Sequence, residues 1–168
     1  MYVDLDLRLR RFEQPGAAIA PAAGSTPAAS GAEPPKTATA APVNVDENDA
    51  YERAQAQRRI GNYQGAIAAF QEFIRKYPKG TLAPRAQYWI GDSYFNLRDF
   101  KSAIASQQRL VAVYPESTSV PDALLNMASS QLESGDNPAA RKTMDGLIAR
   151  YPASDAAEKA RRRLANAR

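Results

Sequence analysis

A tyrosine-proline pair returns every 37 residues along this chain, at Tyr77-Pro78, Tyr114-Pro115 and Tyr151-Pro152. At the same offset a turn-forming dipeptide and an alanine recur, as Gly61-Asn62 with Ala66, Arg98-Asp99 with Ala103, and Gly135-Asp136 with Ala140. A repeat period of about 20 to 50 residues predicts a stacked solenoid rather than a single globular core. Because solenoids bind other chains along an extended surface, the repeat favours a binding function over catalysis.

Each repeat is expected to hold two helices. Proline cannot donate the next helical hydrogen bond and disfavours helical geometry in the residue before it, so each tyrosine-proline pair ends a helix. Pro84 and Pro121 fall in a first helical turn, where a missing N–H costs nothing, and Thr81 is expected to be the N-cap before Pro84. The expected helices span 47–60, 63–76, 81–97, 100–113, 119–134, 137–150 and 154–167.

The predicted fold is therefore an all-α solenoid of three helix hairpins closed by a C-terminal capping helix. The repeats are expected at about 46–80, 81–117 and 118–153, and the capping helix at 154–167. This last helix starts like the first helix of another repeat, because Ala160 and Leu164 fall 37 residues after Ala123 and Met127. Terminal helices that bury one face and present charge outward are what a solenoid needs at its ends.

Two further segments are expected before the repeats at 46–168. Residues 15–45 consist mostly of Ala, Pro, Gly, Ser and Thr. Such a segment cannot bury enough apolar surface to offset its ordering entropy, so we predict a disordered linker. Residues 1–14 carry Tyr2, Leu5, Leu9 and Phe12 at the spacing of a coiled-coil seam. Two heptads are too short to be stable alone, so they are expected to be the end of a longer N-terminal coiled coil.

The composition excludes several classes of chemistry. The chain has neither cysteine nor histidine, which removes thiol chemistry, zinc-thiolate sites and the commonest general base. The glycines form no phosphate-binding loop, and no stretch approaches the length of a membrane span. The formal net charge of +4 is concentrated in the C-terminal helix without interleaved aromatics, unlike a nucleic-acid surface. We therefore predict no catalytic residue, no cofactor, no metal site, no nucleic-acid partner and no membrane insertion.

The repeats resemble the tetratricopeptide repeat, in which small residues let the two helices of a hairpin approach closely and a proline ends the hairpin. The second repeat matches this pattern at Gly91, Tyr94, Ala103 and Pro115. The first matches at Ala54, Ala66, Phe70 and Pro78, and the third at Ala128, Ala140, Met144 and Pro152. The period of 37 residues exceeds the usual 34 of the family, and the extra turn enters at 81–83 and 118–120.

The whole arrangement resembles the YbgF/CpoB proteins of the Tol-Pal system, known as cell division coordinators. The matching stretches are the sequence at 2–9, the sequence from Ala66 to Pro78, and Ala86-Gln87-Tyr88-Trp89-Ile90-Gly91. This resemblance implies a periplasmic protein that self-associates through its N-terminal coiled coil and binds TolA. It also implies a connection between peptidoglycan synthesis by a bifunctional penicillin-binding protein and outer-membrane constriction. A tetratricopeptide scaffold of another envelope assembly system remains the alternative.

A third possibility is a co-chaperone that grips C-terminal carboxylates. The resemblance to tetratricopeptide proteins implies that such a clamp would use Lys, Arg and Asn on the inner helix face. The corresponding positions hold Tyr51, Gln55, Trp89, Asp122 and Asn126, so only one clamp residue is present. An enzymatic function is the least favoured hypothesis.

The family resemblance also implies where a partner binds, because the first helix of each hairpin lines the concave groove. The groove residues expected at matched offsets are Tyr51, Gln55, Arg58, Arg59, Tyr88, Asp92, Phe95, Asn96, Leu125, Ser129, Leu132 and Glu133. Phe95 and Leu132 are the expected anchors. Tyr94, Phe70, Ile90 and Leu110 are assigned to the core, and the three repeated tyrosines to packing that closes each hairpin.

Overall fold

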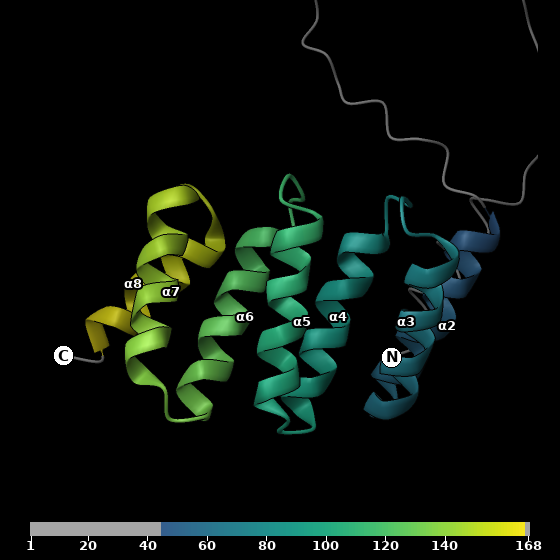
Figure 1. Ribbon diagram of the computed structural model, residues 1–168, viewed down its shortest axis with the longest axis horizontal. Helices are drawn as coiled ribbons and strands as arrows, with labels where there is room; N and C mark the ends of the chain where they lie inside the picture. The colour runs from purple at the N-terminus through teal and green to yellow at the C-terminus, as the bar shows by residue number, and fades with distance from the viewer. Residues whose placement is uncertain (1–44, 167–168) are drawn as a thin grey trace, which may run out of the picture. The chain divides into compact units, whose positions relative to one another are not determined.

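The computed structural model describes residues 45–166, which form seven α-helices and no strand (Figure 1). The helices are α2 (Val45–Arg59), α3 (Tyr63–Lys76), α4 (Ala83–Asn96), α5 (Phe100–Val113), α6 (Val120–Glu133), α7 (Asn137–Arg150) and α8 (Asp155–Asn166). The expected all-α repeat solenoid is confirmed. The predicted coiled-coil end at 1–14 lies outside the described residues. So does the predicted linker at 15–45, except for Val45, which opens α2.

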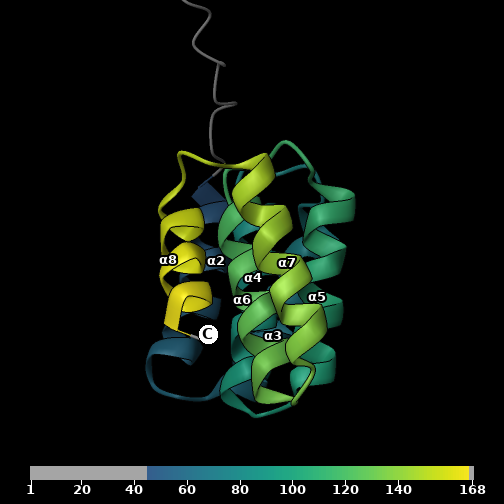
Figure 2. The ribbon, with the colours of Figure 1, turned by 90° about the vertical axis from the view of Figure 1, so that its left-hand side faces the viewer.

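The helices fall into two sets, which we name by their place in the hairpin. The A helices are α2, α4, α6 and α8, and the B helices are α3, α5 and α7. Each helix packs against the next along the chain, and α6 also contacts α4 and α8. In Figure 2 the row is seen end-on, with α8 on its left side and the B helices α5 and α7 on its right. Every B helix is therefore followed by an A helix that packs against it and continues the stack.

Three residues join the helices within each hairpin, and the last two of them form a turn dipeptide that is built the same way three times. The first residue has a positive φ, at Gly61 (79°), Arg98 (61°) and Gly135 (87°). The second residue is the N-cap of the B helix, and its side chain accepts a backbone N–H three residues later at 3.0 Å, as Asn62, Asp99 and Asp136 do. A left-handed residue followed by an Asx cap is a low-cost way to reverse the chain, although Arg98 lacks the conformational freedom of glycine.

The tyrosine-proline pairs end the B helices, as the sequence predicts. Each tyrosine is the C-cap, and its N–H donates to a carbonyl four residues back at 2.8 to 2.9 Å. The expected N-cap Thr81 is wrong, because α4 begins at Ala83 with Leu82 as its cap and no side-chain hydrogen bond. The turn is closed by backbone bonds instead, from Gly80 N to Tyr77 O and from Ala83 N to Gly80 O. These bonds place the start of the helix, so no capping side chain is needed.

The core consists of two apolar clusters. One joins α2, α3 and α4 around Phe70 and Ile90, and the other joins α5 to α8 around Leu110, Met144 and Leu147. The repeated alanines Ala66, Ala103 and Ala140 are fully buried, which confirms that small residues bring the two helices of each hairpin together. Phe70, Ile90 and Leu110 are buried as expected, and Tyr94 is half-buried against the first cluster.

A buried polar side chain sits in the middle of the stack. Gln107 on α5 occupies the repeat position of Phe70 and Met144, and it is fully buried. Its amide nitrogen donates to the carbonyl of Tyr88 and to Asn126 Oδ1, both at 3.2 Å. Its carbonyl oxygen accepts no hydrogen bond from any described residue. The second repeat therefore carries an amide where its neighbours carry an apolar side chain.

Candidate protein-binding site

The first two A helices are joined by a hydrogen-bonded group that includes two expected groove residues. The Tyr51 hydroxyl accepts from Trp89 Nε1 at 2.8 Å and from Gln55 Nε2 at 2.9 Å. Tyr51 and Gln55 are each only 6% exposed, and the Tyr51 ring packs edge-on against Phe70 and Phe73. These two side chains therefore connect α2 with α4 and α3, and they offer a partner little surface.

Arg58 lies at the centre of this hydrogen-bonded group. Its guanidinium carbon is 3.9 Å from the centroid of the Trp89 ring, and its Nε donates to Gln55 Oε1 at 3.0 Å. Its Nη1 is 3.8 Å from Asp92 Oδ2. A planar cation held between an indole ring, an amide and a carboxylate cannot be replaced by lysine without losing the stacking and the fixed donor directions.

One hollow lies on the A-helix face between α4 and α6. It has a volume of about 350 Å³ and is lined by Arg85, Tyr88, Trp89, Thr118, Ser119 and Asp122. Burial, together with the negative charges of Asp92 and Asp122, raises the pKa of Tyr88 to about 12. The phenol is therefore neutral at physiological pH and can act as a hydrogen-bond donor at the edge of this hollow.

A second hollow lies further along the same face and reaches α8. Its volume is about 270 Å³, and its lining combines two apolar side chains, Phe95 and Leu132, with Asp92, Asn126, Ser129, Glu133 and Arg163. Arg163 Nη1 donates to the Ser129 hydroxyl, which connects α8 to α6. Burial raises the pKa of Asp92, and the nearby Arg58 opposes that rise. An apolar wall beside charges of both signs suits a peptide that carries one apolar side chain and polar neighbours.

The structure brings most of the expected groove residues to this one face. Tyr88, Asp92, Phe95, Ser129, Leu132 and Glu133 line the two hollows. Arg58 supports them from α2, while Leu125 is 9% exposed and belongs to the core. Arg59 is exposed and pairs with Glu52 at 2.7 Å, and Asn96 is exposed at the end of α4 and donates to the Asp92 carbonyl at 2.8 Å.

Sequence reasoning missed Arg163 as a groove residue. The last helix was expected to present its charge outward, yet the Arg163 side chain turns onto the A-helix face. The repeat offset could have found it, because Arg163 falls 37 residues after Asn126, which itself falls 37 residues after Trp89. All three side chains lie on this face.

Other kinds of site are not apparent in residues 45–166. No three acidic side chains there gather where they could hold a metal ion. None of the helices of that stretch combines the length and the apolar character needed to cross a membrane.

Comparison with known proteins finds a matching family model and a partial match to a curated relative. A family model described as "YfiO: Outer membrane lipoprotein" matches residues 43–168. The cell division coordinator CpoB of Escherichia coli strain K12 is 39% identical over 54 residues, a match that covers 32% of this chain and 19% of CpoB. The chain thus matches about a fifth of the length of that relative.

Solved structures agree on the fold. The first tetratricopeptide domain of Spaghetti (RPAP3), bound to an HSP90 peptide, has a TM-score of 0.59 at 18% identity and covers 74% of this chain and 95% of its own. The translocator chaperone SycD of Yersinia enterocolitica has a TM-score of 0.55 at 18% identity and covers 73% of this chain and 98% of its own. At such identities the likeness concerns the fold alone.

Proposed function

The chain belongs to the family described as YfiO, outer membrane lipoprotein, and from that premise we propose that it is a non-enzymatic periplasmic adaptor that binds TolA through its A-helix face. In this role it helps to coordinate peptidoglycan synthesis, by a bifunctional penicillin-binding protein, with outer-membrane constriction during cell division. The partial match to the cell division coordinator CpoB supports the TolA assignment. The binding mode rests on the two hollows of the A-helix face, one between α4 and α6 and the other reaching α8.

The groove favours a partner segment with an apolar anchor and mixed charge. Phe95 and Leu132 form its apolar wall, and buried aromatic anchors usually supply most of the binding energy of an interface. Asp92 is partly desolvated and faces Arg58 at 3.8 Å, a distance that leaves room for a competing donor. A lysine or backbone amide of the partner would satisfy that carboxylate better than Arg58 does alone.

Assembly of the full-length protein is part of the same proposal. The protein would self-associate through an N-terminal coiled coil that ends at residues 1–14. The 15–45 linker would then connect several repeat domains to one coiled coil. Such an arrangement would let one assembly engage more than one TolA or penicillin-binding protein, because linked modules raise the effective concentration of the second contact.

The family description favours one alternative function. A family of outer membrane lipoproteins is compatible with a tetratricopeptide scaffold of another envelope assembly system, in which the A-helix face would bind an outer-membrane assembly protein. The two functions differ in the partner and not in the binding surface, so identification of the partner at that surface separates them.

Site-specific photo-crosslinking in cells provides the test. A photoreactive phenylalanine analogue at Ser129, in the centre of the second hollow, should capture TolA, and the same analogue at the exposed Ala68 on α3 should not. An adduct between Ser129 and an outer-membrane assembly protein would support the alternative. Equal capture of TolA at both positions would refute binding through the A-helix face.

A further inference from the structure

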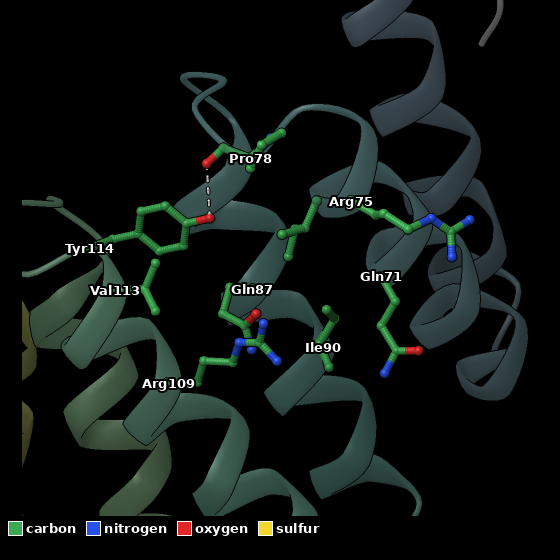
Figure 3. A pocket seen from close by; sticks show the side chains of 9 residues that line it. Gln71, Arg75, Pro78, Gln87, Ile90, Arg109, Val113 and Tyr114 are labelled. Atoms are coloured by element: carbon green, nitrogen blue, oxygen red, sulfur yellow. Dashed lines mark hydrogen bonds between the residues drawn. The ribbon is translucent and has the colours of Figure 1, made fainter.

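A cleft on the opposite layer is independent of the A-helix face. It lies between the B helices α3 and α5, with α4 as its floor, and Figure 3 shows it from close by. One part has a volume of about 510 Å³ and is lined by Gln71, Ile74, Arg75, Pro78, Gln87, Ile90, Arg109, Val113 and Tyr114. A second part of about 260 Å³ shares four of those residues and extends to Tyr94 and Ser102. The two parts therefore form one continuous cleft.

The cleft combines apolar and polar side chains in both its floor and its walls. Ile90 lies in the floor and Val113 on the α5 wall, and Val113 is one of the large apolar side chains that the structure leaves exposed, at 55%. Gln87 is anchored in the floor because its Nε2 donates to the Ser106 carbonyl at 3.1 Å. At one end the Tyr114 hydroxyl donates to the Pro78 carbonyl at 3.1 Å and so connects the two walls (Figure 3).

Both walls carry an arginine that has no strong internal partner. Arg75 on α3 is 3.9 Å from Glu72, and both side chains are more than 70% exposed, so water screens that pair. Arg109 on α5 forms no ion pair or hydrogen bond within residues 45–166, and its side chain points toward the middle of the cleft near Gln87 (Figure 3). Arg109 therefore presents a cationic group in the cleft beside exposed aliphatic surface, and Arg75 carries a second one at the α3 rim, with its guanidinium directed away from the cleft centre (Figure 3).

The repeat supplies an internal control. The positions 37 residues after Arg75, Gln87 and Arg109 hold Ala112, Leu124 and Gly146. The fold of the next repeat forms without any of these polar groups, so the architecture does not require them between α3 and α5. The tyrosine and the proline of the cleft, in contrast, recur in the next repeat as Tyr151 and Pro115, because such residues end the B helices.

We propose that this cleft binds an extended peptide segment of a second partner protein, in which carboxylates flank an aliphatic side chain. From Ser102 to Tyr114 the α5 wall runs for about 18 Å at ~1.5 Å per helical residue. An extended peptide rises ~3.3 Å per residue, so about five residues fit. The carboxylates bind Arg75 and Arg109, the aliphatic side chain contacts Ile74 and Val113, and the exposed amide of Gln71 meets the peptide backbone. The chain thus holds two partners on opposite layers.

The test uses the full chain and a defined probe, the blocked pentapeptide acetyl-Asp-Glu-Leu-Asp-Glu-amide. Titration into the isotope-labelled protein, followed by amide NMR shifts, should perturb residues on the cleft walls and floor and leave the A-helix face unchanged. The neutral analogue with Asn and Gln, and the analogue with Ser in place of Leu, should each bind at least about 10-fold more weakly. Binding should also weaken as salt is added, because the arginines are exposed.

Variants connect the binding to the two arginines. The double variant Arg75→Glu with Arg109→Glu should reduce the affinity for the pentapeptide at least about 10-fold. The matched control Arg150→Glu, which alters an exposed arginine one repeat after Val113, should change it less than about 2-fold. Because all three are surface positions, circular dichroism should be unchanged.

Several outcomes would overturn the proposal. They are no detectable shift on the cleft, shifts on the A-helix face, equal binding of the neutral analogue, and full binding to the double variant. Cleft shifts that depend on protein concentration without peptide would assign the cleft to a second copy of the chain. Saturation with TolA should leave pentapeptide binding unchanged, and a failure of TolA binding would refute the proposed function without affecting this site.

Discussion

A double-mutant cycle at Gly91 and Gln107 tests how the middle of the stack is packed. A Cβ built on Gly91 would lie 2.6 Å from Gln107 Cδ and 3.0 Å from Cγ, closer than packed atoms allow. In the other two repeats alanine occupies the Gly91 position, as Ala54 and Ala128, opposite Phe70 and Met144. We therefore infer that position 91 holds glycine because glutamine occupies the facing position 107.

The magnitudes follow from four effects. Gln107→Met removes a buried acceptor without a partner, a cost of about 1–3 kcal/mol, and gives up two long hydrogen bonds worth about 0.5–1.5 kcal/mol each. Asn126 is half-buried and can bond water instead, so the net expectation is a gain of about 1 kcal/mol. Gly91→Ala alone overpacks the site at a cost of about 1–3 kcal/mol, reduced by about 0.5–1 kcal/mol of helix propensity.

The double variant should be more stable than the sum of the two single effects predicts. With methionine opposite, as in the third repeat, alanine fits, so Gly91→Ala should stabilise the Gln107→Met background by about 0.5–1 kcal/mol. The coupling energy is then about 1–3 kcal/mol, within the range found for residues in contact. Urea unfolding of the four proteins, followed by circular dichroism, measures it. Additive effects, or destabilisation by Gln107→Met of more than about 1 kcal/mol, would refute this account of the packing.

Three further predictions concern the turns and the close helix pair. Arg98→Gly should raise the free energy of unfolding by about 0.5–1 kcal/mol because Arg98 has a φ of 61°, whereas Gly135→Arg should lower it, both by urea unfolding. Ala103→Leu, at a fully buried contact, should destabilise the fold by about 1–3 kcal/mol in the same assay. Hydrogen bonds from Ser102, first from its hydroxyl and then from its N–H, lower the pKa of Asp99. The ionised cap therefore stabilises above about pH 4, the unfolded value, and that stabilisation disappears as the pH falls through the folded pKa. Asp99→Asn, which copies Asn62, should remove this pH dependence in thermal unfolding measured from pH 7 to pH 2, and an unchanged profile would contradict it.

The repeat made the backbone of this fold predictable. The turn dipeptides, the buried alanines and the tyrosine-proline ends are local devices whose physics acts within a few residues, so their spacing in the sequence predicted each helix to within a few residues of its observed ends. The start of α4 escaped prediction because backbone bonds around Gly80 place it, and no side chain signals such bonds.

The burial and the direction of a side chain were harder to predict than the helix face on which it lies. Tyr51, Tyr88 and Leu125 share one repeat position, yet Tyr51 is 6% exposed, Leu125 is 9% exposed and Tyr88 is half-buried beside a hollow. The neighbouring A helix determines how buried each side chain is. At Tyr51 that helix is α4, whose Trp89 donates a hydrogen bond to the Tyr51 hydroxyl. The amide of Gln107 and the turn of Arg163 toward Ser129 likewise depend on contacts between helices that a single sequence does not display.

Binding of a partner to the A-helix face is tested best at Phe95, which lines the second hollow. Titration calorimetry should compare TolA binding by the full chain, by Phe95→Ala and by the control Leu97→Ala, which removes an exposed apolar side chain from the end of the same helix outside both hollows. Phe95 also packs edge-on against Phe100 at 5.7 Å, so circular dichroism must show each variant folded. We expect Phe95→Ala to weaken TolA binding more than about 10-fold, as loss of an anchor worth about 2 kcal/mol does, and Leu97→Ala to leave it unchanged. Unaltered affinity after Tyr88, Phe95 and Leu132 are replaced together in a folded protein would place the binding site elsewhere.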